Sequence, residues 1–311
     1  MHESHEDGGS FGPAHDGAAD HFTDPEKLNI VQFAPPADLA PYVTQLYYFR
    51  CEERDIRDMQ PAALGHIVFK LRGEGELHFA DGRSAKIHPV ILFGPASEAA
   101  EFRLKGPYHN FGLALSPLGF VALTGKAAHE YADRLIDAAE IFGSDIDRLA
   151  LRLQDGARQG IMRPADMVRA ISEFLLPRAK PVKPDHVAVI LAVGNWLSSS
   201  LEPDVEDLLA ELDDMSRSKV TRLMRHYFGA APKPLMRKYR ALRAASHLVD
   251  PETSRELRAQ VESLFYDQPH MIREIRHFTG RTPKALDGDD AKILRMWLSK
   301  DNYRDLDAHP G

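Results

Sequence analysis

Cysteine and long apolar runs are scarce in this sequence of 311 residues. Cys51 is its only cysteine, which excludes a disulfide within the chain and a cysteine-based zinc site. No apolar run approaches the ~20 residues that a membrane-spanning helix needs, so we predict no membrane contact. A chain with so few thiols is typical of a reducing compartment, and we expect a cytoplasmic protein.

Cations are scarce in the first thirty residues, where Lys27 is the only one among seven acids. That composition excludes a signal peptide there, and its glycines and histidines predict a disordered tail over residues 1–27. A metal-binding tract is the weaker interpretation of the histidines in this tail, which are His2, His5, His15 and His21. We predict neither a metal nor a cofactor.

Short runs rich in aromatic and β-branched residues follow between about Val43 and Leu115, among them VTQLYYFRC, GHIVFKL and NFGLAL. Glycine and proline separate them, and Asp81-Gly82 is typical of a hairpin turn. Beyond residue 116 apolar side chains recur at helical spacing. Residues 28–180 are therefore predicted to form a β-rich barrel or sandwich-like domain, β-rich to about 116 and helical after that.

A proline-rich connector, PRAKPVKP at 177–184, cannot continue a helix and predicts a stiff linker, which we place at 181–184. Residues 185–287 have helical periodicity throughout, and a tail with a short helix is expected at 288–311. The predicted fold class is α+β, with an all-α C-terminal domain.

Acidic residues are absent from 216 to 243, a window in which about four would be expected from the composition. If Ser216 caps a helix, Val220, Leu223, Met224 and Tyr227 share one face. Only residues 213–216 separate this helix from the preceding one, which is the length of a helix-turn-helix connection. The opposite face then presents Arg217, Ser218, Thr221, Arg222 and Arg225.

A second segment repeats this layout about fifty residues later. Asp267 can cap a helix that turns Met271, Ile275 and Phe278 inward. Both segments end in glycine, two residues and proline, in FGAAP (228–232) and TGRTP (279–283). A solvated basic face explains one such helix, but the repeat favours two helices that read DNA.

Many residues at fixed offsets complete the pattern. They are Ala210, Ser216, Arg222, Gly229, Pro232, Arg240, Ala244 and Leu248, and then FYDQPHMIREIRHFTGRTP at 265–283. Over its C-terminal hundred residues the chain resembles the DNA-binding domain of the AraC/XylS family of bacterial transcription regulators. The resemblance implies two helix-turn-helix units joined by a long helix, and a sequence-specific regulator that is not an enzyme.

Seven base-contacting residues follow from the resemblance, and we call the helices that carry them reader helices. They are Ser218, Thr221 and Arg222 in the first unit and Gln268, Pro269, His270 and Arg273 in the second. Four cations are better placed to anchor phosphates, namely Arg217, Arg225, Lys238 and Arg276. Double-stranded promoter DNA is the implied partner, with a small effector and RNA polymerase as further candidates, for a monomer or a homodimer.

Some residues depart from the family pattern. Asp214 and Leu264 replace the glycine of the two tight turns, and Gln260 replaces a buried small residue. An acidic run between Glu202 and Asp214 precedes the first reader helix and would repel phosphate if it faced DNA. A protein–protein module with decayed DNA reading is therefore the alternative, and we expect the second unit to be the weaker reader.

The N-terminal segments LAPYVTQLYYFR (39–50) and LFGPASEA (92–99) resemble the poorly characterised domain that accompanies some AraC-like regulators. That resemblance implies effector binding or self-association. Barrel-filling aromatics are the structural alternative for the candidate pocket residues, which are Tyr47, Phe49, Phe69, Phe93, Tyr108 and His109.

A metal-dependent barrel enzyme is the least favoured alternative. Its candidate ligands would be His66, His78, His88 and His109. A barrel metal site usually needs two histidines one residue apart beside a carboxylate, and this sequence has none. Phosphate-binding glycine loops and serine-elbow motifs are absent as well.

Overall fold

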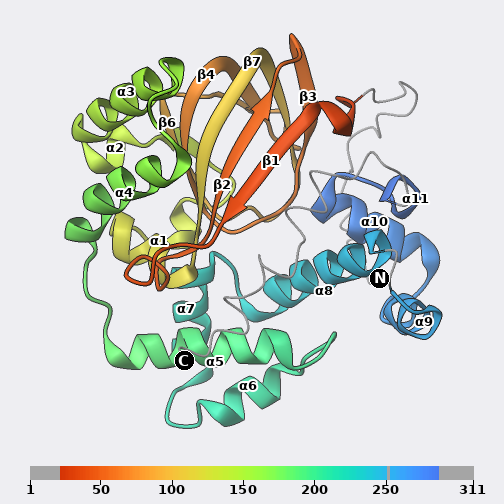
Figure 1. The fold of residues 1–311 in the computed structure, drawn as a ribbon. Coiled ribbons are helices and arrows are strands. Elements are labelled where there is room, and N and C mark those ends of the chain that lie inside the picture. Colours follow the sequence, from red (N-terminus) through yellow and green to blue (C-terminus); the bar gives the residue numbers. More distant parts are fainter. Residues whose placement is uncertain (1–21, 251–252, 287–311) are drawn as a thin grey trace, which may run out of the picture.

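The computed structural model describes residues 22–250 and 253–286. Most of the predicted tail at 1–27, including its four histidines, and the predicted tail at 288–311 lie outside these residues. Within the described chain, a β-rich domain precedes a domain made only of helices (Figure 1). The predicted α+β class is thus confirmed.

One antiparallel sheet of eight strands forms the N-terminal domain, in the order β1-β2-β7-β4-β6-β8, with β3 paired to β7 and β5 to β4. The long strands β4 and β7 pair along most of their length, through register shifts near Arg72. The Asp81-Gly82 turn joins β4 to β5, and Gly82 has the positive φ of 87° that the turn requires. The strands are β1 (Leu28–Phe33), β2 (Val43–Cys51), β3 (Asp55–Gln60), β4 (His66–His78), β5 (Ser84–Lys86), β6 (Val90–Phe93), β7 (Ala100–Leu115) and β8 (Leu135–Asp137).

Helices cover one face of this sheet and one of its ends (Figure 1). Alternate strand residues such as Ile67, Leu92 and Leu113 pack with Ile146 and Leu153 in the largest apolar core. Ser116 begins the first helix, where its hydroxyl accepts a hydrogen bond from the Gly119 amide. The helical segments are η1 (Pro25–Lys27), α1 (Pro117–Thr124), η2 (Ala128–Glu130), α2 (Ala139–Phe142), α3 (Asp145–Arg158), α4 (Pro164–Leu175) and η3 (Leu176–Arg178).

The C-terminal domain contains the two predicted helix-turn-helix units. The first unit consists of α6 and α7, the second of α9 and α10, and α8 runs between them (Figure 1). Gly229 and Gly280 end α7 and α10 at positive φ, because a left-handed residue there lets the amide satisfy a terminal carbonyl. The helices are α5 (Pro184–Ser199), α6 (Val205–Glu211), α7 (Arg217–Phe228), α8 (Pro232–Val249), α9 (Arg255–Ser263), α10 (Gln268–Thr279) and α11 (Pro283–Leu286).

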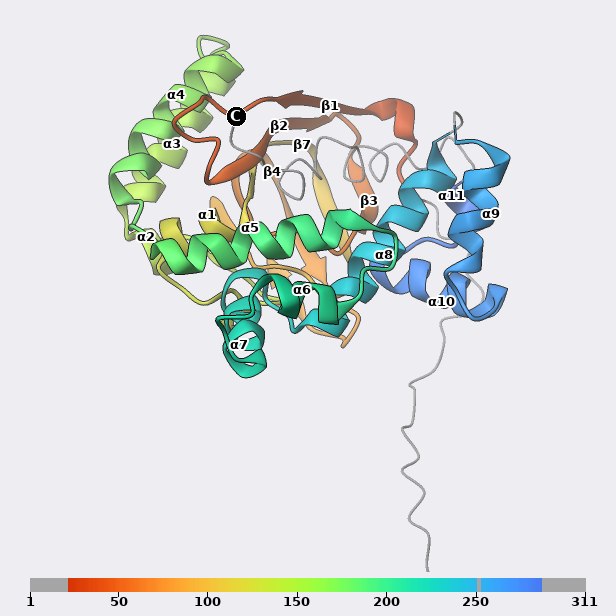
Figure 2. The same ribbon diagram turned by 90° about the horizontal axis from the view of Figure 1, so that it is seen from below.

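Both helix-turn-helix units are docked on the N-terminal domain. Helix α7 contacts η2 and α1, while α8 and α10 share an apolar cluster with Phe79 and Phe93. Backbone hydrogen bonds also connect the two domains. The Ala62 amide donates to the Phe278 carbonyl at 2.8 Å, and the Ala99 amide donates to the His277 carbonyl at 2.9 Å. In the view from below, α7 lies at the lower edge of the molecule and α9–α11 at its right-hand end (Figure 2).

Candidate DNA-binding surface and N-terminal cavity

The first reader helix, α7, separates an apolar face from a basic one. Ser216 caps it by accepting a hydrogen bond from the Lys219 amide. Its buried residues are Val220, Leu223, Met224, Tyr227 and Phe228, which pack with α5 and α6. Of the residues predicted to face DNA, Arg217, Ser218, Arg222 and Arg225 are exposed and Thr221 is half-buried.

The second reader helix, α10, has the same division. The Asp267 carboxylate accepts a hydrogen bond from the His270 amide at 2.7 Å, which begins the helix, and Met271, Ile275 and Phe278 are buried. The predicted contact residues Gln268, Pro269, Arg273 and Arg276 are exposed. His270 is half-buried instead, with its ring against Phe265 and 3.9 Å from the Glu274 carboxylate.

Four reader-helix arginines have no acidic partner in the part of the chain that the structure describes. Arg222 and Arg225 on α7, and Arg273 and Arg276 on α10, form no ion pair with any residue in 22–250 or 253–286. Arg217 differs, because Glu206 holds its guanidinium at 2.6 Å, although both side chains are exposed. An exposed pair of this kind contributes at most about 1 kcal/mol, so a phosphate could displace the carboxylate.

Lys238 does not lie where a phosphate contact requires it. Its side chain is buried in the domain interface, where Nζ donates to the Ala96 carbonyl at 3.0 Å. Burial lowers the pKa of Lys238 to about 8, against the opposite effect of the Asp133 carboxylate. Lys238 lies on the face of α8 that packs on the N-terminal domain, so the predicted phosphate contact is wrong for this residue.

Three acidic residues of the run before α7 form ion pairs or a helix cap within the C-terminal domain. Glu202 pairs with Arg240 at 2.7 Å, Glu206 with Arg217, and Asp204 caps α6 by accepting from the Glu206 amide. These contacts join α6 and its preceding loop to α7 and α8. The other acids of the run, Asp207, Glu211, Asp213 and Asp214, are exposed, so negative charge remains beside α7.

The two turns that lack the family's glycine avoid the left-handed region. Leu264 has φ −73° and ψ −11°, and among the described non-glycine residues only Asp133 has a positive φ. The turn before α10 thus keeps its leucine in the right-handed region, which a residue with a side chain favours. Helix α9 packs weakly, since Val261 is its only buried residue and Gln260 is exposed.

Helix α10 is tied to α8 by a buried carboxylate. Glu274 lies 2.5 Å from the Arg237 guanidinium and 3.7 Å from that of Arg240. Burial alone would raise the pKa of Glu274, but the hydrogen bond and charge of Arg237, with His270 and Arg240, hold it below its ordinary value. This contact orients the second reader helix relative to α8.

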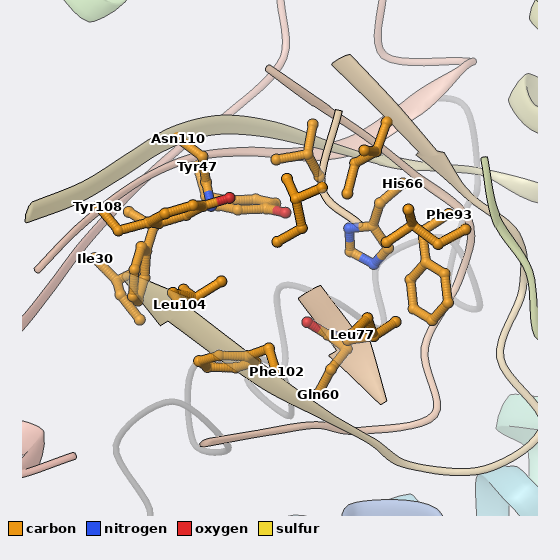
Figure 3. A pocket seen from close by; sticks show the side chains of 15 residues that line it. Ile30, Tyr47, Gln60, His66, Leu77, Phe93, Phe102, Leu104, Tyr108 and Asn110 are labelled. Atoms are coloured by element: carbon orange, nitrogen blue, oxygen red, sulfur yellow. The ribbon is translucent and has the colours of Figure 1, made fainter. Parts of the chain in front are cut away.

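A cavity lies within the N-terminal domain (Figure 3). Val68 lines it, whereas the next residue, Phe69, packs on the other face of the sheet with residues of α3. The space open to the centre of a water-sized molecule is about 90 Å³. Four of the six predicted pocket residues line it: Tyr47, Phe49, Phe93 and Tyr108. The described residues that line it are Ile30, Tyr47, Phe49, Gln60, His66, Val68, Leu77, Ile87, Ile91, Phe93, Phe102, Leu104, Tyr108, Asn110 and Leu135.

The other two predicted pocket residues lie elsewhere because strand side chains alternate between faces. Phe69 follows Val68 on β4 and points into the core beneath the helices. His109 lies between Tyr108 and Asn110 on β7, and its Nε2 contacts the Glu52 carboxylate at 2.9 Å outside the cavity.

Three polar cavity residues were missed: Gln60, His66 and Asn110. Burial lowers the pKa of His66 to about 3, so its imidazole is neutral at physiological pH. Burial also raises the pKa of Tyr47 and of Tyr108, which keeps both hydroxyls protonated. Alternation from Tyr108 would have found Asn110. The residue predicted on β4 was Phe69, which has the opposite parity to His66, so alternation from it leads to the other face.

The candidate metal ligands are dispersed. His66 lies in the cavity, His78 contacts Glu76 at 2.8 Å, His88 contacts Asp137 at 3.3 Å, and His109 contacts Glu52. Within the described ranges no three histidine, cysteine, aspartate or glutamate side chains are grouped to hold a metal ion. Among the described helices, none has the length and apolar content to span a membrane.

Comparisons with known proteins give one family match and several structural likenesses. Residues 31–137 match the model of a family described as a domain of unknown function (DUF6597). No curated protein matches the chain.

The solved structures similar to this chain include ToxT from Vibrio cholerae, at 10% identity and a TM-score of 0.42, over 88% of this chain and 98% of that one. ToxT from Vibrio cholerae O395 is 11% identical, with a TM-score of 0.43, over 88% and 99% of the two chains. The AraC-like transcriptional activator CuxR is 10% identical, with a TM-score of 0.30, over 71% and 87%. The resemblance of this chain to the AraC/XylS family rests on its C-terminal residue pattern, which the structure resolves into two helix-turn-helix units joined by α8.

Proposed function

We propose that this protein is a sequence-specific DNA-binding transcription regulator of AraC type, whose N-terminal domain senses a small effector or mediates self-association. The observation that supports it best is the pair of exposed arginine faces on α7 and α10. Each belongs to a capped helix whose opposite face is buried, and four of their guanidinium groups have no acidic partner among the described residues. Such faces can enter the major groove of a duplex.

The roles of the side chains follow from their chemistry. Arg222 and Arg273 would make bidentate hydrogen bonds to guanine edges, and Pro269 would contact a thymine methyl. The polar groups of Ser218, Thr221, Gln268 and His270 would complete the base contacts. Arg217, Arg225 and Arg276 would neutralise phosphates and so orient the protein on the duplex. Lys238 is no longer assigned such a role, because it is buried.

A two-step experiment tests the proposal. Mapping of the DNA occupied in cells would supply target fragments, and binding of purified protein to these would then be measured at two salt concentrations. Arg222→Ala should weaken binding by about 1–3 kcal/mol and relax the sequence preference. Arg152→Ala, at an exposed position of α3 in the N-terminal domain, is the matched control and should bind like the wild type. Equal binding by wild type and Arg222→Ala contradicts the proposal.

A second candidate function is a protein–protein module that has lost DNA reading. The weak packing of α9, with Val261 as its only buried residue, favours it for the second unit. Arg273→Ala distinguishes the cases. If only Arg222→Ala weakens binding, the first unit alone reads DNA. If no fragment binds in an arginine-dependent manner, the module is favoured.

A further inference from the structure

The cavity of the N-terminal domain combines an apolar wall with polar atoms that lack partners. Gln60 Nε2 and Asn110 Oδ1 are inaccessible to solvent and have no hydrogen bond within the described chain. Such groups are rare in folded proteins, because a buried donor or acceptor without a partner loses its bonds to water and gains nothing. In Figure 3 the two side chains lie on different sides of the cavity, with His66 on a third.

The charge of the wall restricts what the cavity can take. Among the described residues that line it, none is an aspartate, glutamate, lysine or arginine. His66 adds no charge at neutral pH, since burial lowers its pKa to about 3. An ionised carboxylate or ammonium group would lose its hydration here without a counter-charge, which is strongly unfavourable.

The size of the cavity restricts the ligand further. A space of about 90 Å³ for the centres of water-sized molecules is several times what one water needs. It corresponds to about six to nine non-hydrogen atoms, or one ring with a short substituent.

We propose that this cavity binds a small neutral molecule with a ring-sized apolar body and one or two hydrogen-bonding groups. In Figure 3 the Gln60 side chain points toward the cavity, where its amide would exchange a hydrogen bond with a carbonyl, hydroxyl or N–H group of the ligand. Only the role of this molecule as an effector rests on the proposed function.

The cavity shares its wall with the domain interface. Leu77 and Phe93 line the cavity and also belong to the apolar cluster formed with Leu242 of α8 and Phe278 of α10. Two residues beyond Gln60, the Ala62 amide donates to the Phe278 carbonyl. A ligand that contacts Gln60 and Phe93 therefore acts directly on the surface that seats the second reader helix.

Benzamide and benzoate, which match each other in size and shape and differ in charge, are suitable probes. Binding would be measured by titration with ligand-observed NMR. Benzamide should saturate the wild type with a Kd of about 10 mM or tighter. Benzoate should bind at least about tenfold more weakly, because its charge must be desolvated. Equal affinity for the two, or no saturable benzamide binding, overturns the inference.

Two kinds of variant test whether benzamide binds in the cavity. Gln60→Leu removes one hydrogen-bonding group at nearly constant volume and should weaken benzamide binding about tenfold. Val68→Phe fills the cavity and should abolish binding, with Ile91→Phe from the neighbouring strand as a second filling variant if Val68→Phe fails to fold. Benzamide binding unchanged in a folded filling variant overturns the assignment.

The effect of a cavity ligand on the domain interface and the proposed DNA binding are tested by separate measurements. Bound benzamide should slow hydrogen exchange at the Ala62 amide by about twofold or more and leave α3 unchanged. Unchanged exchange at Ala62 in the saturated protein overturns the coupling. If benzamide fails to bind while arginine-dependent DNA binding persists, only this inference is lost. If benzamide binds but no DNA does, the cavity assignment stands and the regulator proposal is lost.

Discussion

The carboxylate of Asp58 on β3 accepts a hydrogen bond from the guanidinium of Arg281, the second residue after α10, and both side chains are almost fully buried. The guanidinium also lies 4.2 Å from the centroid of the Phe22 ring. This ion pair joins the N-terminal sheet to the end of the second reader helix. Because desolvation offsets much of the attraction in a buried pair, we infer that its main role is to define how the two domains dock.

Removing one partner of this pair should be costly. Asp58→Asn leaves the buried Arg281 charge without its counter-charge, and we expect a loss of about 3–5 kcal/mol in the free energy of unfolding. Urea denaturation measures the loss. Asp55→Asn, on the same strand but with an exposed Lys105 partner, is the control and should cost less than about 1 kcal/mol. Similar losses in the two variants would contradict a buried, unshielded pair.

Arg276→Ala should alter the salt dependence of DNA binding. If Arg276 contacts one phosphate, its loss lowers the slope of log K against log salt by about 1 and leaves the sequence preference intact. The slope would be taken from titrations between about 50 and 200 mM salt. An unchanged slope, together with wild-type affinity, would mean that Arg276 lies off the DNA.

Lys238→Met tests whether Lys238 is buried in the domain interface and makes no contact with DNA. The variant keeps the length of the side chain but removes a buried charge, so we expect DNA affinity to equal that of the wild type. The pKa of Lys238 is about 8 in the fold, below its unfolded value, so protonation favours the unfolded chain. The wild type should therefore gain stability as pH rises through 8 and toward 10, and the variant should not.

Either measurement can show that Lys238 is not held in the domain interface. Loss of DNA affinity in Lys238→Met, at the level seen for Arg222→Ala, would mean that the lysine leaves the interface when DNA binds. Identical pH profiles of unfolding for wild type and variant would mean that Lys238 is solvated.

His66 should make the fold sensitive to acid. Its pKa is about 3 in the folded protein and about 6.5 when unfolded, so the unfolded chain binds the proton first. Stability contributed by the neutral ring is fully present above pH 6.5 and falls by up to about 1.4 kcal/mol per pH unit below it.

Unfolding in urea at several pH values between 7 and 5 would measure that slope. His66→Gln should flatten it, whereas His129→Gln, at an exposed position, should leave it as in the wild type. If His66→Gln retains the wild-type slope, another group is responsible for the acid sensitivity.

Much of the helical domain could be predicted because its signals are local. Ser216 and Asp267 satisfy amides three residues ahead, and Gly229 and Gly280 end their helices through bonds to carbonyls four residues back. The division of α7 and α10 into buried and exposed faces follows from a period of 3.6 residues. The cavity residues were predicted only in part. They were chosen by residue type, but the position of a residue along its strand decides which face of the sheet its side chain lies on, as Phe69 and His109 demonstrate.

The sequence by itself thus determined the order of the elements, the caps and the basic faces of the two reader helices, since each depends on residues within about one helical turn. Only the tertiary structure decided that Lys238 is buried against Ala96, that Asp58 pairs with Arg281, and that the cavity wall also seats α10. These contacts join positions 142 and 223 residues apart. Their existence depends on which surfaces meet when the two domains pack, and no local periodicity carries that information.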